Sequence, residues 1–454
     1  MHKILAVVLA VCGLTVSLGC SSGSGEAEVS SSSGQVATSS AVTQTAATQT
    51  ATQTASATQT ASATQTAVTT QTAAATQTAS ATQTASATQT AVTQAATATA
   101  IPAASPIDLT SIDAVCESRD GYIYCTSSVL AAPSEATIGW GELSGVSPEV
   151  FCATDITTQV CEWMTRGLLA AISRWGNYAP VEYWVLGTDY EAYENLTAEN
   201  CARRIGRGQM RQSDCDRRHG PDGNHGFYSY WKLGSDSVAS GRPGGSAGLN
   251  GDRQWGIHFF TSSLPVGFTD YFEVNGLNEQ KTLHHEYFHG VQHAHIYTKD
   301  RSQRDKLLGP VWFNEGAAEY MAHVALKEGR ASGLIDMVKT EGRWSFEFEE
   351  EMGYKMQAWE RNSLTCPGLK LKDMTYQNSC NNSSYDLGTW AHAYLANKYG
   401  ATVLLNTYYP MLNDVSDWEE AFVATYGISS DEFLAEFDEF LKLSLSEQME
   451  ILPK

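Results

Sequence analysis

Two histidines and a glutamate stand at a spacing that could hold and use a metal ion. The segment is His285-Glu286-Tyr287-Phe288-His289. Residues four apart lie on the same face of a helix, so the two imidazoles can bind one ion between them. Glu286 would then project beside the ion, where its carboxylate can take a proton from activated water. The spacing predicts metal-assisted hydrolysis if a third ligand exists.

A second acidic segment offers that ligand. Residues 312–320 read WFNEGAAEY and follow His289 across a loop long enough to reverse direction. Glu315 would complete a two-His, one-Glu zinc site with one position left for water. Gly316 is expected to let this helix approach the motif helix closely. Glu319, one turn further on, is predicted to accept the free N–H of a metal-bound imidazole. The alternative, a solvated helix face, fits poorly with the apolar residues around both glutamates.

Together the two segments resemble a known family. HEYFHGVQ followed by WFNEGAAEY is similar to the gluzincin metallopeptidases, which include thermolysin, the aminopeptidase N family and bacterial collagenases. The collagenase-like, peptidase MA-like type is the most similar, and the resemblance covers about residues 280–325. It implies a thermolysin-like fold and a zinc (Zn2+) cofactor. It also implies roles for five residues: His285, His289 and Glu315 as ligands, Glu286 as the base, and Glu319 as support for a ligand.

A shorter match lies nearer the C-terminus. Tyr385-Asp386-Leu387-Gly388 resembles the Y-x-x-G of the aminopeptidase branch, in which the tyrosine steadies the oxyanion of the tetrahedral intermediate. By that resemblance Tyr385 is a second catalytic residue, although His392 on the helix expected to follow could serve instead. The sequence carries no evident motif for gripping a substrate N-terminus, which argues against an aminopeptidase.

Another histidine near the motif offers a competing metal site. His295 stands six residues after His289, where the metzincin group has its third histidine. That pattern needs a glycine at position 292 to turn the chain, and this sequence has Gln292. His284 and His293 are also near the motif, but histidines of this kind are commonly packed or solvated, and no role is assigned to them.

The N-terminus predicts export and a lipid anchor. His2 and Lys3 precede an apolar run from Ile4 to Val16 that is too short to span a bilayer comfortably. The following Ser-Leu-Gly-Cys, ending at Cys20, resembles a bacterial lipobox. This implies a signal peptide over residues 1–19 and membrane attachment through acyl chains on Cys20. An ordinary secreted protein that is cut nearby is the alternative.

Residues 20–105 are expected to be a disordered linker. They consist largely of Ala, Thr, Gln and Ser in a repeating pattern and contain almost no large apolar side chains. Such a segment cannot bury enough surface to offset its chain entropy. It would act as a spacer between the membrane and a folded part.

Charge and cysteines narrow the class of protein. The net charge of −21 argues against a nucleic-acid partner.

With an export signal, cysteines that fall as sequence neighbours suggest local disulfides, although eight cysteines permit 105 pairings. None has the C-x-x-C spacing of a zinc ribbon. The four couples are Cys116 with Cys125, Cys152 with Cys161, Cys201 with Cys215, and Cys366 with Cys380.

Strand signals precede helix signals along the chain, which predicts an α+β fold with an N-terminal mixed sheet and a C-terminal helical lobe. The first part, residues 106–300, ends in the HEYFH helix, and the second, residues 301–454, carries the third ligand. The first part is expected to contain a helix at Val160–Trp175, strands at Val181–Leu186 and Trp255–Phe260, a long loop at 201–254, and the motif helix at Glu279–Tyr297. Helices are expected in the second part at Phe313–Lys327, Thr389–Tyr399, Trp418–Tyr426 and Asp431–Leu445, with Ser429 and Glu432 as a capping box and Gly400 and Gly427 as C-terminal stops.

The sequence therefore predicts an extracellular, zinc-dependent endopeptidase acting on protein or peptide substrates. Substrate would enter extended beside an edge strand, for which Trp255–Phe260 is the candidate. Two alternatives stay open. The first is a surface binding or adhesion lipoprotein that keeps the fold without turnover, which the intact Glu286 disfavours. The second is a peptidase restricted to glycosylated or otherwise modified chains.

Overall fold

The computed structural model describes residues 113–133, 139–223, 226–240, 247–251, 258–263, 277–335, 347–378 and 380–454. The predicted signal peptide, Cys20 and the linker lie outside these residues. Within the described part of the chain, no helix is long and apolar enough to cross a membrane.

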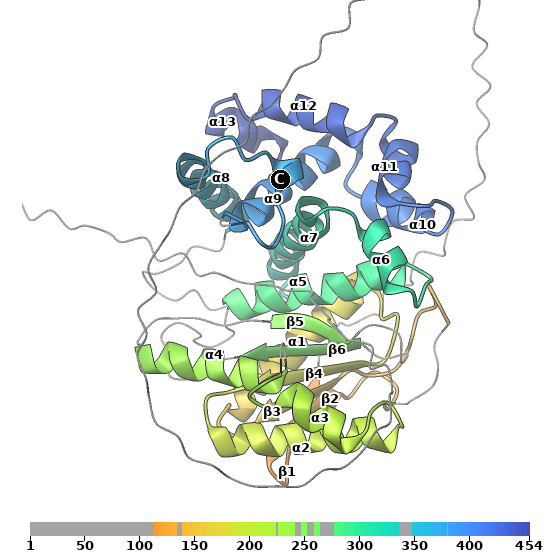
Figure 1. Ribbon diagram of the computed structural model, residues 1–454, viewed down its shortest axis with the longest axis vertical. Helices are drawn as coiled ribbons and strands as arrows, with labels where there is room; N and C mark the ends of the chain where they lie inside the picture. The colour runs from red at the N-terminus through yellow and green to blue at the C-terminus, as the bar shows by residue number, and fades with distance from the viewer. Residues whose placement is uncertain are drawn as a thin grey trace, which may run out of the picture. The chain divides into compact units, whose positions relative to one another are not determined.

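A six-stranded mixed sheet forms one end of the folded part (Figure 1). Its order is β1-β2-β3-β4-β6-β5, with β3, β4 and β6 parallel to one another and the remaining neighbours antiparallel. All six residues of β4 are buried, as expected for a strand covered on both faces. The strands are β1 (Ala114–Arg119), β2 (Tyr122–Ser127), β3 (Glu149–Ala153), β4 (Val181–Leu186), β5 (Ala247–Gly251) and β6 (His258–Ser263).

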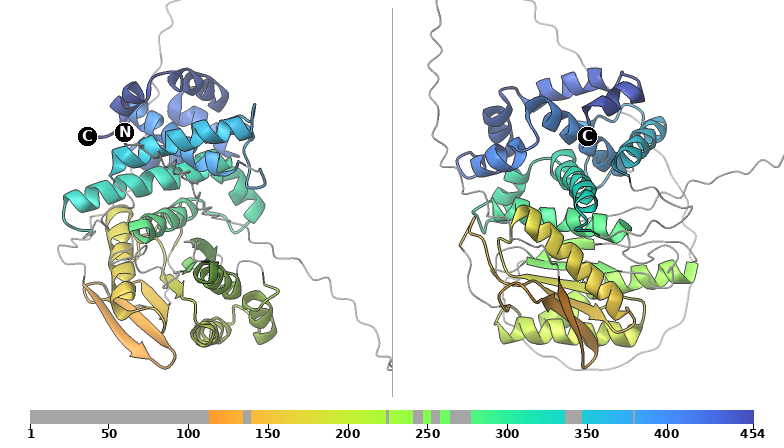
Figure 2. Two further views of the ribbon diagram at one scale, coloured as in Figure 1. Left: turned by 90° about the vertical axis from the view of Figure 1, so that its left-hand side faces the viewer. Right: turned by 180° about the vertical axis from the view of Figure 1, so that it is seen from behind.

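Helices cover both faces of this sheet. Figure 2 shows the first helix on one face and the next three on the other. Thr157 and Asp189 begin the two longer helices by accepting a backbone N–H with their side chains. The four helices are α1 (Thr158–Trp175), α2 (Tyr190–Gly206), α3 (Gln212–His219) and α4 (Phe227–Ser240).

The rest of the chain is helical and lies beyond β5 (Figure 1). The motif helix α5 packs on α1 and β5 on one side and on α7 on the other, and α7 packs in turn on α9. The helices are α5 (Leu277–Ala294), α6 (Arg301–Leu308), α7 (Val311–Ala331), α8 (Phe348–Thr365), α9 (Asn382–Tyr399), α10 (Tyr409–Met411), α11 (Trp418–Tyr426), α12 (Ser430–Phe440) and α13 (Leu445–Gln448). Short helical segments occur at η2 (Leu371–Asp373), η3 (Leu404–Tyr408) and η4 (Met449–Ile451).

The α+β class and the mixed sheet are confirmed, and so are most predicted elements. The predicted strand at Val181–Leu186 and helix at Trp418–Tyr426 have the observed bounds. Ser429 and Glu432 form the predicted capping box, and Gly427 ends α11 in the left-handed conformation. The last predicted helix, Asp431–Leu445, is shorter than expected, because α12 ends at Phe440 and a separate helix, α13, begins at Leu445.

Two predictions for residues 106–300 are wrong: the long loop, and the edge position of the second strand. The predicted loop at 201–254 contains the end of α2, all of α3 and α4, and β5. Buried residues at helical spacing line one face of α2 and of α4, whereas the polar helix α3 buries Cys215, which is bonded to Cys201, and His219. The predicted strand Trp255–Phe260 is observed from His258, with residues 255–257 outside the described part. That strand, β6, is paired on both sides, by β4 and β5, so it is not an edge strand.

Four disulfides tie sequence neighbours together, as the cysteine spacing predicted. They join Cys116 to Cys125, Cys152 to Cys161, Cys201 to Cys215, and Cys366 to Cys380. Disulfides are typical of proteins that fold in an oxidising, extracellular setting.

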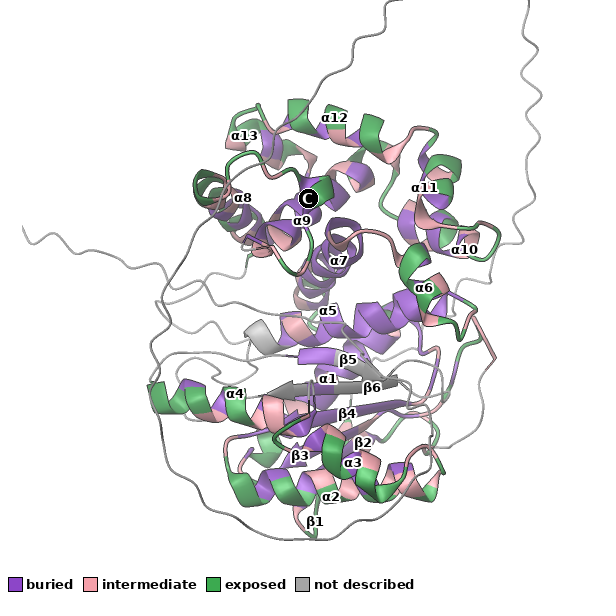
Figure 3. Cartoon of the chain, viewed as in Figure 1, coloured by how far each residue is buried: buried purple, intermediate pink, exposed green. Residues whose placement is uncertain are grey.

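Burial singles out α7, the helix that carries both glutamates. Every residue from Trp312 to Leu326 is buried, and Figure 3 shows this helix almost wholly in the buried colour. A solvated face for Glu315 and Glu319 is therefore excluded. Polar groups buried to this degree need partners, and the partners define the site.

Candidate metal centre

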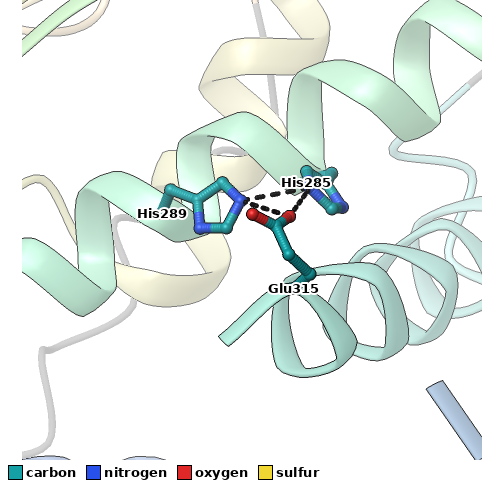
Figure 4. A group of neighbouring side chains, drawn as sticks. All are labelled: His285, His289 and Glu315. Atoms are coloured by element: carbon teal, nitrogen blue, oxygen red, sulfur yellow. Dashed lines mark hydrogen bonds and ion pairs between the residues drawn. The ribbon is translucent and has the colours of Figure 1, made fainter. Parts of the chain in front are cut away.

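Three side chains from two crossing helices converge on one point (Figure 4). His285 and His289 extend from successive turns of α5, and Glu315 reaches them from near the start of α7. Glu315 Oε2 lies 3.2 Å from His285 Nε2 and 3.1 Å from His289 Nε2, and the two Nε2 atoms are 3.1 Å apart. The structure thus brings together the three residues selected as ligands from the sequence.

The separations of these atoms fit a four-coordinate metal ion. Zinc binds imidazole nitrogen and carboxylate oxygen at about 2.0–2.1 Å, so tetrahedral ligand atoms lie roughly 3.3 Å from one another. The three observed distances, 3.1 to 3.2 Å, are close to that value. Two nitrogens and one carboxylate oxygen are also a donor set that zinc accepts. His285, His289 and Glu315 can therefore hold one metal ion, and their donor set suits zinc.

Glu319 fixes the first ligand histidine. Its Oε2 lies 2.8 Å from His285 Nδ1, and a carboxylate can only accept, so Nδ1–H donates. This leaves Nε2 of the neutral ring with its lone pair aimed at the metal position. The contact is the one predicted for Glu319 from its place one turn after Glu315.

Two buried lysines hold Glu319 in turn. Lys281 Nζ lies 3.1 Å and Lys355 Nζ 2.8 Å from Glu319 Oε1, and both lysines are nearly inaccessible to solvent. Burial disfavours the carboxylate, but the two ammonium groups outweigh it and keep the pKa of Glu319 well below its usual range. Lys281 stands one turn before His285 on α5, while Lys355 comes from α8.

Gln292 orients the second ligand histidine. Its Oε1 lies 2.7 Å from His289 Nδ1, so that this ring also donates through Nδ1 and presents Nε2 to the metal position. The amide nitrogen of Gln292 donates to the carbonyl of Asn314 and to the hydroxyl of Tyr409. From the sequence, Gln292 served only as evidence against the metzincin pattern. Its position three residues after His289, on the same helix face, is the signal that could have identified it.

The carboxylates of the site change the proton affinity of both histidines. Burial lowers the pKa of His285, but hydrogen bonds with Glu315 and Glu319 raise it to about 9. The pKa of His289 is also raised, because the charge of Glu315 outweighs burial. Glu286 contributes to both shifts, so its buried carboxylate lies near both imidazoles. Burial opposes ionisation of Glu315, but the histidines lower its pKa to about 2.

Of the two groups considered for the oxyanion, Tyr385 is the one whose ring lies beside a ligand, His285. Its ring lies nearly parallel to that of His285, with ring centroids 6.3 Å apart. His392 is in the core on the same helix, α9, where its Nε2 donates to the carbonyl of Phe313. Burial lowers the pKa of His392 to about 4, which keeps its ring neutral.

Tyr376 also reaches the site and was not anticipated from the sequence. Its hydroxyl donates to Glu315 Oε1 at 2.5 Å, on the carboxylate oxygen that the histidines leave free. Tyr376 precedes α9 and lies between Cys366 and Cys380, far from both motifs along the chain. No helical spacing or motif links it to Glu315, so only the tertiary structure reveals it.

The remaining histidines near the motif are held elsewhere. His295 Nδ1 lies 2.8 Å from the carbonyl of Val291, and its ring packs against Tyr178 and Tyr409. His284 Nδ1 lies 2.7 Å from the carbonyl of Gln280. Among the described residues, the potential metal ligands that cluster include neither of these histidines. The metzincin pattern is thus excluded in favour of Glu315.

The prediction for Gly316 needs correction. It does not face α5, the motif helix, because a Cβ on Gly316 would meet the backbone of Gly388 in α9 at 2.4 Å. The close helix approach is real, but it joins α7 to α9.

Comparisons of the chain with family models, with curated proteins and with solved structures gave no match.

Proposed function

We propose that this protein is an exported, zinc-dependent endopeptidase of gluzincin type, which hydrolyses peptide bonds in protein or peptide substrates. The observation that carries the proposal is the buried group of His285, His289 and Glu315 with Glu286 beside it. Two histidines and one glutamate are the ligand set of a catalytic zinc site, which keeps one position for water or substrate. The resemblance of both motif segments to gluzincins supports the same reading.

Zinc bound at this site would polarise the scissile carbonyl and lower the pKa of water. In this proposal Glu286 would accept the proton from the attacking water and return it to the amine that leaves when the C–N bond breaks. Tyr385, beside His285, is the group we assign to the developing oxyanion. Glu319 and Gln292 keep the two imidazoles in the tautomer that offers Nε2.

The substrate-binding strand must be reassigned because β6 lies inside the sheet. The outer strand next to α5 is β5, and it contacts the motif helix directly (Figure 1). An extended peptide beside β5 would run past the metal centre and pair through main-chain hydrogen bonds. Such pairing reads the backbone more than the side chains, so we expect broad specificity.

A binding or adhesion protein that only retains the fold is the less favoured function. Burial of a carboxylate is costly, and Glu286 is 1 % exposed beside three side chains that could hold a metal ion without it. A protein kept for binding alone has no need of this group. Peptidase activity needs it as the base.

The test uses the purified protein loaded with zinc and an unbiased peptide library. We expect cleavage at internal bonds by the wild type and its loss in Glu286→Gln, with zinc still bound stoichiometrically by the variant because all three ligands remain. A matched control is Glu349→Gln, which changes a glutamate on the exposed side of α8. Equal cleavage by wild type and Glu286→Gln, or none by a zinc-loaded wild type, would refute the peptidase assignment.

A further inference from the structure

The two oxygens of Glu315 have different partners. Both histidines meet Oε2, whereas Oε1 accepts the hydroxyl of Tyr376. Hydrogen bonds to an ionised carboxylate are among the stronger ones in proteins, and this one lies in a site where Glu315 is wholly buried. A carboxylate held in this way offers one oxygen to a metal. If it turned to offer both, it would fill the coordination position that water or substrate needs.

Tyr376 depends on the segment that carries it. This segment joins α8 to α9, and the Cys366–Cys380 disulfide closes it at the base. Leu371 and Met374 are buried and anchor its first half. Near the tyrosine, Asn381 donates through Nδ2 to the carbonyl of Tyr376 at 3.2 Å.

The disulfide is the covalent part of that anchorage. It ties the C-terminal end of α8 to the start of α9, so the chain between them can adopt far fewer conformations than an open segment of equal length. The segment packs on α9 through η2, and the hydroxyl of Tyr376 can reach Glu315 only while the segment keeps that place.

We infer that Tyr376 is a positioning residue of the metal centre, which holds Glu315 to one-oxygen coordination, and that the Cys366–Cys380 disulfide acts on the metal centre through it. The inference rests on the metal-binding part of the proposed function and does not require peptidase activity. It predicts that zinc affinity depends on a tyrosine and a disulfide outside both motif segments.

The first measurement is zinc affinity, by competition with a chromophoric chelator, for the wild type and Tyr376→Phe. We expect affinity to fall roughly 10- to 100-fold, as for other lost partners of metal ligands. Tyr354→Phe, on the exposed side of α8, is the matched control and should bind as the wild type does. With cobalt(II) as the probe, Tyr376→Phe should show weaker visible absorption, because band intensity falls when a second carboxylate oxygen raises the coordination number.

The second measurement concerns the disulfide. Cys366→Ser/Cys380→Ser should lower zinc affinity about as much as Tyr376→Phe, and the triple variant should bind no more weakly than Tyr376→Phe alone. The matched control is Cys201→Ser/Cys215→Ser, which opens a disulfide of the same sequence separation, 14, between α2 and α3. Circular dichroism of each variant establishes that the fold is retained.

Different results would refute the positioning role of Tyr376, the action of the disulfide and the proposed function. Wild-type affinity in Tyr376→Phe would overturn the positioning role. Independent, additive losses in the triple variant would overturn the action of the disulfide through Tyr376. A wild-type protein that binds zinc but cleaves no peptide would refute only the proposed function, and one that binds no zinc would refute both.

Discussion

Gly316 of α7 and Gly388 of α9 meet where these helices cross, and neither has room for a side chain. A Cβ on Gly316 would lie 2.4 Å from the carbonyl carbon of Gly388, and a Cβ on Gly388 would lie 2.4 Å from the carbonyl oxygen of Trp312. Glu315 directly precedes the first glycine, and Tyr385 stands one turn before the second. This crossing therefore sets the distance between the third ligand and the tyrosine beside His285.

Gly388→Ala should force the two helices apart. We expect the free energy of unfolding to fall by about 1–3 kcal/mol, the usual cost of overpacking, and turnover to fall with it. Urea denaturation measures the first effect. Gly206→Ala at the end of α2, where a Cβ meets nothing within 4 Å, is the control and should not destabilise the protein. Equal stability of Gly388→Ala and wild type would show that the crossing is not tightly packed in solution.

Removal of Glu319 should harm both folding and metal binding. Glu319→Ala leaves Lys281 and Lys355 buried without their shared carboxylate, which costs about 3–5 kcal/mol of unfolding free energy. Zinc affinity should fall roughly 10- to 100-fold, because His285 loses its hydrogen-bond acceptor. The control is Glu349→Ala, which breaks an exposed pair with Lys327 and should cost less than about 1 kcal/mol. Losses of similar size in both variants would contradict this role.

Zinc binding should strengthen as pH rises toward about 9. In the metal-free protein the pKa of His285 is raised to about 9, so below that pH zinc has to displace a proton. Apparent affinity should increase at least tenfold per pH unit between pH 6.5 and 8.5. Calorimetry in buffers of different ionisation enthalpy measures the proton release. A pH-independent affinity over this range would contradict the assigned state of His285.

The same shift makes the metal-free fold less stable at high pH. A histidine whose folded-state pKa lies above its unfolded value of 6.5 contributes stability that is fully present below pH 6.5. That contribution is lost as pH rises through about 9. Denaturation of chelator-treated protein at several pH values checks the sign, since stability that increases over this window would disagree with it.

Tyr385→Phe should reduce turnover, whereas His392→Ala should reduce the stability of the fold. Loss of one oxyanion donor slows turnover by roughly 10- to 1000-fold while zinc and stability are kept. His392 donates to the carbonyl of Phe313 in the core, so His392→Ala should reduce stability by about 1–3 kcal/mol. Kinetics and denaturation of the two variants measure these two effects and decide which residue stabilises the oxyanion. Full activity in Tyr385→Phe would remove the tyrosine from the mechanism and leave the metal site intact.

Cys20→Ala should release the protein from membranes. The prediction comes from the lipobox-like sequence and concerns a residue outside the described part of the chain. Fractionation of cells that express the full chain, followed by mass spectrometry for acyl chains on the N-terminal cysteine, measures it. Membrane attachment that persists in the variant would show that Cys20 is not the anchor.

The sequence by itself determined the features that depend on neighbours along the chain. His285 and His289 share a helix face because four residues make about one turn, and Ser429 caps a helix through Glu432 three residues later. The Cys366–Cys380 disulfide joins cysteines 14 residues apart, and nearness in sequence favoured this pairing among the 105 that eight cysteines permit. Local geometry fixes the first two features, so the residue pattern was sufficient to predict them, whereas it made the disulfide only the most economical choice.

Only the tertiary structure decided which distant segments meet. The partner of Gly316 is Gly388 on α9, and β6 is an inner strand. Tyr376 and Lys355, both far from the motifs along the chain, contact Glu315 and Glu319. Tyr376 is 61 residues from Glu315 along the chain. No helical or strand period spans such a distance, and these contacts form only because the packing of α7, α8 and α9 brings the segments together.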